Sequence, residues 1–464
     1  MELFKLHVEN LGRIKQAELS IRPLTVFVGP NNTNKTWTAY ALYGLAKWLS
    51  WESAKLRPFV ESDLISGVDV DLKVGSVVQD TVNQEVTRLS AAGEDALVLA
   101  EVGREGMLKK LSYPVSIRLT PAGLGELLAV SEEHFQDSRV CLEFDEVHLS
   151  SAPLDTVSLK LTERSGPVCS MMVARRRGGK PVSGWTRYEA EGSAQGDFAR
   201  SVVRMAAEFV LLGRFGQVVA LPAERKGLIV VTDLLQEQEF REFLSQPVVD
   251  FVGLLRRATR RFKRREHLQQ IPDMASLLEK RLLAGSLKVE GGETPLALLY
   301  DFGHGAPLRM HAASSLVRAL AGLDLYLRYL AEPGDLIVID EPEMNAHPEA
   351  QLMIAELLGI LVNKGINVVI TTHSPYIVDH INNLVEAAHL CEEKQKEIAG
   401  RFKLQTKDAF VPEENVATYE FHDDGQVTNV FDRGQRLIDW DTFGKVSDEV
   451  SKLFNDILVA AHEE

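Results

Sequence analysis

The stretch LTVFVGPNNTNKT, from Leu24 to Thr36, decides the fold of this chain. Its first five residues are mostly apolar and stop at Gly29, a pattern typical of a buried strand that leads into a loop. Gly29 to Thr36 matches the phosphate-binding pattern G-x-x-x-x-G-K-[ST], except that Asn34 stands at the second glycine. Residues 36–50 then have the apolar spacing of a helix. This order predicts an α/β fold with a phosphate site where the helix begins.

The loop supplies the candidate phosphate ligands: Gly29, Pro30, Asn31, Asn32, Thr33, Asn34, Lys35 and Thr36. The backbone amides of such a loop point at the phosphates, its lysine neutralises charge on the β- and γ-phosphates, and its hydroxyl binds Mg²⁺. We assign these last two roles to Lys35 and Thr36, with ATP as the expected ligand. The second glycine position often requires a positive φ, which asparagine tolerates best among the other residues. Asn34 is therefore compatible with a working loop.

The stretch LIVIDEPE, residues 336–343, predicts a second buried strand that carries carboxylates out at its C-terminal end. Ligands of an open α/β sheet bind at that end of the strands. We expect Asp340 to hold Mg²⁺ together with Thr36, and Glu341 to orient and deprotonate the attacking water. The alternative is a strand that ends in a solvated acidic turn, which is rare after four aliphatic residues in a chain with a phosphate loop.

Two further stretches place polar groups at the end of a strand or the start of a helix. VVITTHS, residues 368–374, predicts a third buried strand, and His373 beyond it is expected to bond the γ-phosphate. HAASSLVRAL, residues 311–320, places Ser314 and Ser315 before a helix, where hydroxyls, amides and the helix dipole can receive an anion. An N-cap pair is the other interpretation of these serines. We name three candidate catalytic residues: Lys35, Glu341 and His373.

Composition limits the class of protein. The 464 residues suffice for two or three compact units, and a hydrophobic content of 45% supports a sizeable core. No apolar run reaches the ~20 residues of a membrane helix, and the N-terminus lacks the pattern of a secretion signal. The three cysteines are scattered and fit neither a disulfide framework nor a zinc site, so we expect a cytoplasmic protein. The net charge of −15 argues against a surface coated for nucleic acid, but it leaves room for a local basic patch.

The order of these motifs resembles ABC-type ATPases of the SMC and RecF kind. The resemblance is closer to the OLD-like ATPases grouped as AAA-15 or AAA-21, which have a PAxR motif after a strand, a double-serine signature, DEPExxxHP and TTHS. The corresponding stretches here are PAER (Pro222–Arg225), AASS (Ala312–Ser315), DEPEMNAHP (Asp340–Pro348) and TTHS (Thr371–Ser374). The resemblance covers residues 1–50, 216–232 and 286–390, and more loosely the tail.

The resemblance implies an ABC-type ATPase head, with a mixed central sheet and a phosphate loop, that oligomerises at least as a dimer around ATP. In that family the serine signature reaches across the dimer to the partner's γ-phosphate, a role that would fall to Ser314 or Ser315. Arg225 matches a motif arginine, to which we assign a phosphate or interface contact. Asn34 and Leu316 stand where the family commonly has glycine, and both could slow hydrolysis or weaken ATP-driven dimerisation.

The phosphate loop and the metal-binding strand lie about three hundred residues apart, so we predict a head interrupted by a large helical and antiparallel-β insertion. The predicted segments are 1–50, the first part of the head; 51–135, mostly helical; 136–195, an antiparallel β subdomain; 196–232, a return to the core; 233–285, an arginine-rich helical insertion; 286–390, the second part of the head; and 391–464, a small β pair and a closing helix.

OLD nucleases carry a Toprim domain after the ATPase, and this chain has only about ninety residues beyond His373, which we judge too few for that domain. Asp439 and Asp441 form a D-x-D pair, which we interpret as the start of a helix. We therefore expect an ATPase that is not itself a nuclease. By resemblance to the ATPase subunits of anti-phage systems such as PARIS and Septu, its partner would be a separate effector, such as a Toprim or HNH nuclease.

A run of basic residues leaves other functions open. Arg256 to Arg265 contains seven arginines and lysines, which on a helix form a stripe that could track a phosphate backbone. A solvated face is the other interpretation. Arg175–Arg177 and Lys180 form a second basic cluster at a predicted hairpin turn. The alternatives are thus a RecF-like, ATP-dependent DNA-binding repair protein, and a protein that binds ATP without turnover.

Overall fold

The central sheet has six strands in the order β11-β15-β16-β3-β17-β18. The computed structural model describes residues 2–50, 68–72, 97–98, 115–144, 156–163, 167–177, 180–189, 215–231, 244–263, 272–290, 297–439, 451–454 and 456–457. The strands of this sheet are β3 (Leu24–Val28), β11 (Val218–Leu221), β15 (Leu336–Asp340), β16 (Asn367–Thr371), β17 (Val416–Phe421) and β18 (Val427–Asn429). The first five run parallel, and β18 pairs with β17 in the antiparallel direction.

The strand order brings the predicted motifs together at the C-terminal ends of the parallel strands. Every residue of β3 and β15 is buried, as expected of parallel strands covered on both faces. Because β16 lies between β15 and β3, the loops that follow these three strands emerge side by side. The predicted fold class is confirmed: the chain has an α/β head with a mixed central sheet and a phosphate loop, and the two parts of the head are far apart in the sequence.

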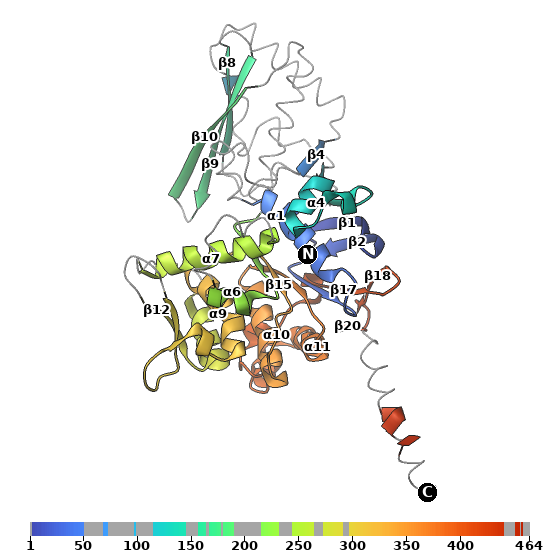
Figure 1. Cartoon of the computed structure of the whole chain (residues 1–464), viewed down its shortest axis with the longest axis vertical. Helices are drawn as coiled ribbons and strands as arrows, with labels where there is room; N and C mark the ends of the chain where they lie inside the picture. Colours follow the sequence, from blue (N-terminus) through green and yellow to red (C-terminus); the bar gives the residue numbers. More distant parts are fainter. Residues whose placement is uncertain are drawn as a thin grey trace.

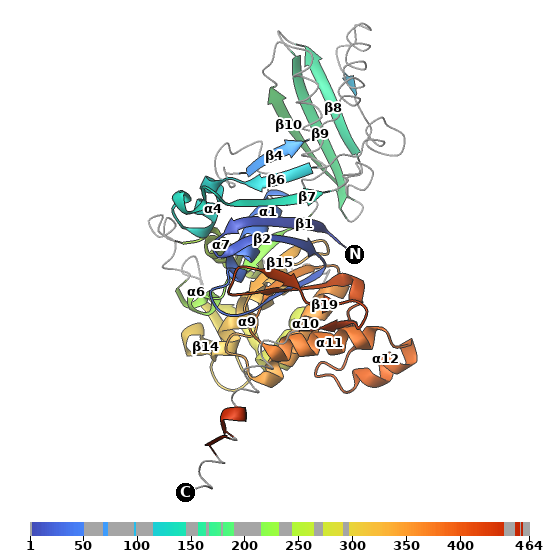
Figure 2. The ribbon, with the colours of Figure 1, turned by 90° about the vertical axis from the view of Figure 1, so that its right-hand side faces the viewer.

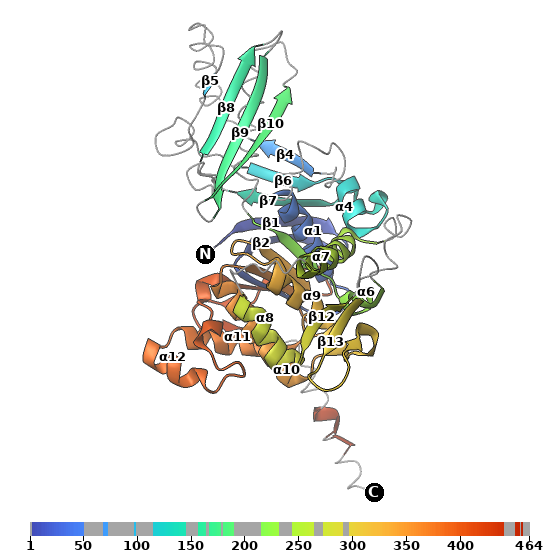
Figure 3. The same cartoon turned by 90° about the vertical axis from the view of Figure 1, so that its left-hand side faces the viewer.

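Helices cover the sheet, and α1 also joins it to a second sheet. Helix α1 (Lys35–Trp48) contacts β11, β15 and β16 of the central sheet and also β1, β6 and β7 (Figure 2). Helix α10 (Pro348–Asn363) packs against β3, β16 and α11 (Pro375–Ala388). Helix α9 (Ser315–Tyr329) packs against α6 (Arg225–Val231), α7 (Gln246–Lys263) and α8 (Pro272–Leu278), as Figure 3 shows. Buried side chains from α6, α7, α8, α9, α10 and α11 form one core cluster with the central sheet.

The second sheet is antiparallel and has the order β2-β1-β7-β6-β4. Its strands are β1 (Phe4–Leu11), β2 (Ile14–Ile21), β4 (Val68–Leu72), β6 (Val115–Leu119) and β7 (Arg139–Phe144). The segment 51–135 was expected to be mostly helical, and this was wrong for its described part, where α4 (Pro121–Leu128) and the short helix Glu132–Phe135 accompany strands. The stretches VDVDL and VSIRL alternate with the two-residue period of a strand, not with the spacing of a helix. Strand β7, expected in a separate subdomain, also belongs to this sheet.

The predicted antiparallel subdomain is otherwise present as the sheet β10-β9-β8-β5, at the end of the molecule opposite the C-terminus in Figure 1. Its strands are β5 (Leu97–Val98), β8 (Thr156–Glu163), β9 (Pro167–Arg177) and β10 (Lys180–Glu189). Strands β9 and β10 pair with Arg177 opposite Lys180, so the second basic cluster lies at a hairpin end as predicted. The arginine-rich segment is helical in its described part, and Arg264 and Arg265 lie outside the described residues.

The small β pair predicted for the C-terminal part is present as β17 and β18. Strands β17 and β18 do form a hairpin, but all six residues of β17 are buried and it pairs with β3, so the hairpin completes the central sheet. The predicted helix 196–215 lies outside the described residues except for Phe215. Trp440, Asp441 and most of the closing helix also lie outside them.

The remaining elements are short. They are a π-helix (Glu279–Leu283), β12 (Ser286–Glu290), β13 (Ala297–Asp301), β14 (Leu308–Arg309), α12 (Glu392–Ala399), β19 (Phe431–Asp432), β20 (Leu437–Ile438) and the 3₁₀ turns Met310–Ala312, Lys407–Ala409 and Glu413–Asn415. Within the described ranges, no helix has the length and apolar character needed to cross a bilayer.

Candidate functional site

The phosphate loop has the backbone conformation that its sequence predicts. Asn34 has φ 66° and ψ 24°, in the left-handed region, so the expectation of a positive φ at this position is confirmed. Asn32 also has a positive φ, of 62°. Gly29 has φ 131°, and a Cβ atom there would lie 2.2 Å from the carbonyl oxygen of Phe421, so only glycine fits. The loop therefore turns sharply out of β3 and enters α1 at Lys35.

The side chain of Asn34 gives this residue a second role that the sequence did not indicate. Its Oδ1 accepts a hydrogen bond of 2.8 Å from the backbone N–H of Arg13, in the turn between β1 and β2. A Cβ atom on Gly12 would lie 2.4 Å from Asn34 Nδ2, so the turn packs directly on the amide. The β1–β2 turn also packs against the β17–β18 hairpin, because a Cβ atom on Gly425 would lie 2.0 Å from Arg13 O. The asparagine thus joins the phosphate loop to the β1–β2 turn, which itself packs against the β17–β18 hairpin.

Lys35 lies inside the loop and is 5% exposed. Its Nζ donates to Gly29 O at 2.9 Å, Pro30 O at 2.6 Å and Thr33 Oγ1 at 3.3 Å. Burial lowers the pKa of this ammonium to about 8, against the opposing effect of carboxylates of which Glu341 contributes most. The lysine is thus a desolvated cation that satisfies its donors with the loop's own oxygens.

The predicted metal ligands lie together. Thr36 Oγ1 donates to Asp340 Oδ1 at 3.1 Å, and Thr371 Oγ1 donates to the same oxygen. Tyr40, on the next turn of α1, donates to Asp340 Oδ2 at 3.4 Å. One hydroxyl and one carboxylate fit Mg²⁺, which keeps several waters and takes one or two protein carboxylates plus substrate phosphates. The described residues hold no group of three metal-binding side chains, so a cation here would depend on such additional oxygens.

Glu341 and His373 face each other beyond this pair. His373 Nε2 lies 3.7 Å from Glu341 Oε1. The backbone N–H of Glu341 donates to Thr371 O at 3.1 Å and Oγ1 at 3.2 Å, and Glu341 itself has φ 46°. Burial, and then the charge of Asp340, raises the pKa of Glu341. Burial, and then the charge of Lys35, lowers the pKa of His373, so its imidazole is neutral at pH 7.

Glu343, the second glutamate of DEPE, holds the histidine in place, a role the sequence analysis missed. Its Oε1 accepts from Thr372 Oγ1 at 2.7 Å and from the His373 backbone N–H at 2.8 Å. Ser374 then caps α11 by accepting from the N–H of Ile377 at 3.2 Å. The sequence signal for this role was the second glutamate of DEPE. It follows β15, so it lies beside the residues that follow the neighbouring strand β16.

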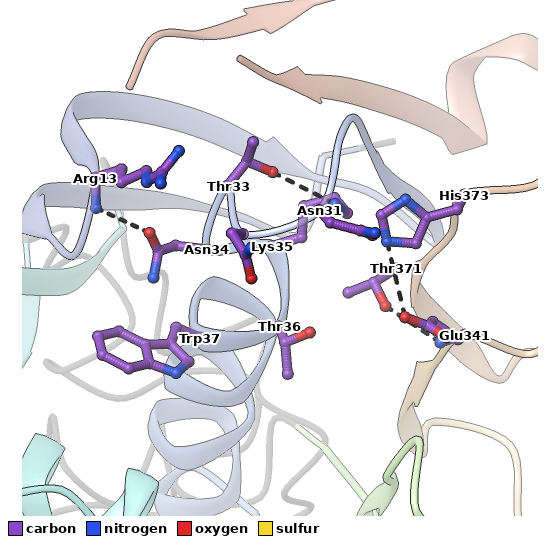
Figure 4. A pocket seen from close by; sticks show the side chains of 11 residues that line it. Arg13, Asn31, Thr33, Asn34, Lys35, Thr36, Trp37, Glu341, Thr371 and His373 are labelled. Atoms are coloured by element: carbon purple, nitrogen blue, oxygen red, sulfur yellow. Dashed lines mark hydrogen bonds and ion pairs between the residues drawn. The ribbon is translucent and has the colours of Figure 1, made fainter. Parts of the chain in front are cut away.

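These groups line a pocket of about 560 Å³, and Figure 4 shows Arg13 and Trp37 at one end of it, with Glu341 and His373 at the other. The lining residues are Arg13, Asn31, Asn32, Thr33, Asn34, Lys35, Thr36, Trp37, Glu341, Thr371 and His373. Sequence reasoning missed Arg13 and Trp37. The Trp37 ring also packs edge-on against Phe135, with centroids 5.6 Å apart. An aromatic residue directly after the K-T pair was the available signal.

Two predicted groups do not line this pocket. Ser314 is exposed and caps α9 by accepting from the N–H of Val317 at 3.3 Å, as the N-cap interpretation predicts for this serine, and its contact with an anion stays a prediction. Ser315 accepts from Arg318 Nη2 at 3.4 Å. Both serines therefore lie at an exposed helix N-terminus, away from the lining residues of their own chain.

Arg225 is also elsewhere than predicted. It is 1% exposed, and its guanidinium donates to the backbone carbonyl oxygens of Pro222, Ala319, Asp340 and Glu341. A phosphate or an interface contact was expected, and that expectation was wrong for the conformation described, because the side chain is enclosed. The apolar strand before PAER folds the arginine back under the end of β15 instead of toward the pocket.

Known proteins resemble parts of this chain. A family model described as "AAA domain, putative AbiEii toxin, Type IV TA system" matches residues 223–379. The Old nuclease of Escherichia phage P2 is 30% identical over 125 residues, which make up 26% of this chain and 21% of that protein. The chain thus spans about a fifth of the length of this curated relative.

The solved structures that this chain matches include SMC heads. The SmcHead bound to the C-winged helix domain of ScpA is 12% identical, with a TM-score of 0.33 over 92% of this chain and 96% of that chain. The SMC head domain from Thermotoga maritima is 12% identical, with a TM-score of 0.30 over 82% of this chain and 92% of that chain. The family match contains Ser314, Asp340, Glu341 and His373, and two of these residues, Glu341 and His373, line one pocket with the phosphate loop. The match and the loop together suggest a P-loop ATPase.

Proposed function

We propose that this pocket binds ATP with Mg²⁺ and hydrolyses it. The observation that carries the proposal is the convergence of Lys35, Thr36, Glu341 and His373 on one pocket from segments about three hundred residues apart. Thr36 and Asp340 would hold Mg²⁺, which neutralises phosphate charge when it is bound. A buried lysine, a hydroxyl paired with a carboxylate and a second carboxylate are the groups that phosphoryl transfer to water requires.

Each residue has a role that follows from its surroundings. Lys35 binds phosphate oxygens in place of the loop carbonyls that it now contacts. Glu341 orients a water and accepts its proton, which its raised pKa favours. His373, neutral and held by Glu343, lies beside Glu341 and would donate its one ring N–H to a phosphate oxygen. These three roles place general-base chemistry at one end of the pocket.

The other end of the pocket is suited to the base and ribose. Trp37 offers an aromatic face and Arg13 a guanidinium, and both line the pocket beyond Lys35. Stacking of a base on an aromatic side chain contributes about 1–3 kcal/mol. Arg13 Nη1 lies 3.8 Å from Asp423 Oδ1, so this arginine is held near the C-terminal hairpin when it is not on a nucleotide.

Two heads complete the active unit in this proposal. The exposed hydroxyls and amides at the start of α9, at Ser314 and Ser315, form an anion-binding helix terminus that does not serve the pocket of its own chain. We assign them to the γ-phosphate on a partner head. ATP would then join two heads, and Glu341-dependent hydrolysis would release them, in the cytoplasm.

The biological role proposed is control of a separate effector in defence against phage. The support is the description of the family model, which names a putative toxin of a type IV toxin–antitoxin system, and the similarity to a phage nuclease. The effector is expected to be a second protein with nuclease activity, of the Toprim or HNH kind.

The deciding experiment captures the Glu341→Gln protein with ATP from its own host and measures the native mass and composition. The substitution blocks proton acceptance and should trap the assembled state. A second polypeptide at fixed stoichiometry is expected. A bare homodimer that carries nucleic acid would instead support the RecF-like alternative, with α7 as the basic surface. A monomer with no bound nucleotide would contradict the proposal.

A further inference from the structure

Arg225 connects two parts of the site that the proposed function treats separately. Its Nε donates to Ala319 O at 2.9 Å. Its Nη1 donates to Pro222 O at 3.0 Å and Asp340 O at 2.6 Å, and its Nη2 to Glu341 O at 2.8 Å. Every nitrogen of the guanidinium therefore donates to a backbone carbonyl, and none is directed at the pocket.

The acceptors belong to different elements. Ala319 lies on the second turn of α9, the helix that begins at the signature serines. Asp340 and Glu341 end β15 and begin the loop that carries the proposed base. Helix α6, which starts at Arg225, also packs against α9. A single side chain thus ties the signature helix to the backbone of Glu341.

The backbone of Glu341 needs such support. A glutamate with φ 46° is in the left-handed region, a backbone conformation that is strained for a non-glycine residue. Thr371 holds its N–H from one side, and Arg225 holds its carbonyl oxygen from the other. The direction of the Glu341 side chain follows from this conformation, because φ and ψ fix where the Cβ atom points.

Only a guanidinium can make this arrangement. Its planar fork presents donors in several fixed directions, whereas a lysine ammonium concentrates three donors on one atom. The carboxylates of Asp340, Glu343 and Glu341 interact electrostatically with the buried charge and stabilise it. A lysine at this position would keep the charge and lose the bridge.

We propose that Arg225 is a positioning residue that couples the signature helix to the hydrolytic glutamate of the same chain. A partner's nucleotide seated at Ser314 would move the start of α9, and the shift would reach Glu341 through Ala319 and Arg225. Binding of ATP in one head would then set the base of the other. This inference rests on the proposed ATPase function.

The test is Arg225→Lys in the full chain, with ATP affinity measured by calorimetry and turnover by phosphate release. We expect kcat to fall about 100-fold, the effect of a misplaced catalytic group, with ATP affinity changed by less than about threefold. Arg22→Lys is the matched control, because Arg22 also donates to a backbone carbonyl, that of Glu414. It should leave both quantities unchanged. A folded Arg225→Lys protein with wild-type kcat would overturn the inference.

A second measurement remains valid if Arg225→Lys does not fold. Hydrogen exchange of Glu341→Gln protein, with and without ATP, should show joint protection of residues 316–323 and 340–345. Adding Ser314→Ala should abolish both protections together. Protection of 340–345 that persists without that of 316–323 would show that the two segments are uncoupled. A wild-type chain with no ATP turnover would reject the proposed function itself, whereas normal turnover in the Arg225→Lys protein rejects only the coupling.

Discussion

The phosphate loop and the PAER segment each bury one cation, and the two cations differ in what they face. Lys35 donates to carbonyls of its own loop and lines the pocket. Arg225 donates to carbonyls of other elements and does not line the pocket. From the sequence, both are motif residues: Lys35 is assigned to phosphate, and Arg225 to a phosphate or interface contact. A buried cation that lines the pocket, such as Lys35, can exchange its carbonyl partners for phosphate, and we call it a ligand cation. A buried cation whose partners join different elements of the fold, such as Arg225, stabilises the structure, and we call it a framework cation.

The largest expected effect is on stability, at Arg225. Arg225→Met removes four buried hydrogen bonds from a charged donor to backbone carbonyl oxygens, and one such bond contributes about 1.5–3 kcal/mol. We expect the free energy of unfolding, measured with urea, to fall by at least the contribution of one such bond. Lys226→Met, a change at the adjacent and less buried position, is the control and should have little effect. An unchanged unfolding midpoint for Arg225→Met would remove the distinction between framework and ligand cations.

Lys35 should show the opposite pattern. Lys35→Met removes charge-assisted bonds to phosphate, each worth about 1.5–3 kcal/mol, so ATP affinity should fall by about tenfold to more than 100-fold. Stability should stay the same or rise, because a desolvated ammonium is removed. Calorimetric titration with ATP and urea unfolding of the same preparation measure the two effects. If the Lys35→Met protein is less stable but keeps its affinity for ATP, Lys35 is a framework cation, like Arg225.

Trp37 tests a residue with features of both classes, because its ring packs against Phe135 and also lines the pocket. If it stacks on the base, Trp37→Ala should weaken ATP binding by about 1–3 kcal/mol. Trp37→Phe keeps an aromatic face and should retain most of the affinity. If both variants lose the same amount of stability and neither changes its affinity for ATP, the role of Trp37 is to pack against Phe135 and not to bind the nucleotide.

The fold and the residues at the C-terminal ends of the strands could be predicted, because short sequence patterns indicate them. Buried strands such as LIVID read as continuous apolar runs, and the positive φ of Asn34 followed from the glycine position that it occupies. The burial of Arg225 was not predictable, because it depends on carbonyls about a hundred residues away in the chain. The same holds for β17, whose neighbour β3 lies about four hundred residues earlier. Pairing over such distances leaves no periodic trace in the sequence.

The pH dependence of ATP binding sharpens the description of Lys35. With its pKa lowered to about 8, the free lysine is largely neutral above that pH, whereas bound phosphate favours the charged form. Binding above pH 8 therefore requires proton uptake, and affinity for ATP should fall by up to about tenfold per pH unit. Calorimetry in two buffers of different ionisation enthalpy at pH 8.5 should detect this proton uptake, and much less of it at pH 7. Equal proton uptake at the two pH values would contradict this. For folding, the same lowered pKa means that the loss of stability from burying the charge is fully present at pH 7 and is relieved as pH rises above 8.

The smallest expected effect is at Asn34, where the sequence departs from the common glycine. Asn34→Gly keeps the left-handed backbone but loses the 2.8 Å bond to the Arg13 N–H, worth about 0.5–1.5 kcal/mol. It also adds flexibility to the unfolded chain, so restoring the common residue should lower stability. ATP affinity should change little, because the path of the loop amides is unchanged.

Asn34→Asp is the matched comparison, since it retains the Oδ1 acceptor. Its stability should stay near that of the wild type, while its negative charge beside the phosphates should weaken ATP binding. A glycine variant that is as stable as wild type and turns over ATP faster would mean that the asparagine only impairs the loop. The opposite result would mean that Asn34 belongs with Arg225, as a residue selected for what it holds together rather than for what it binds.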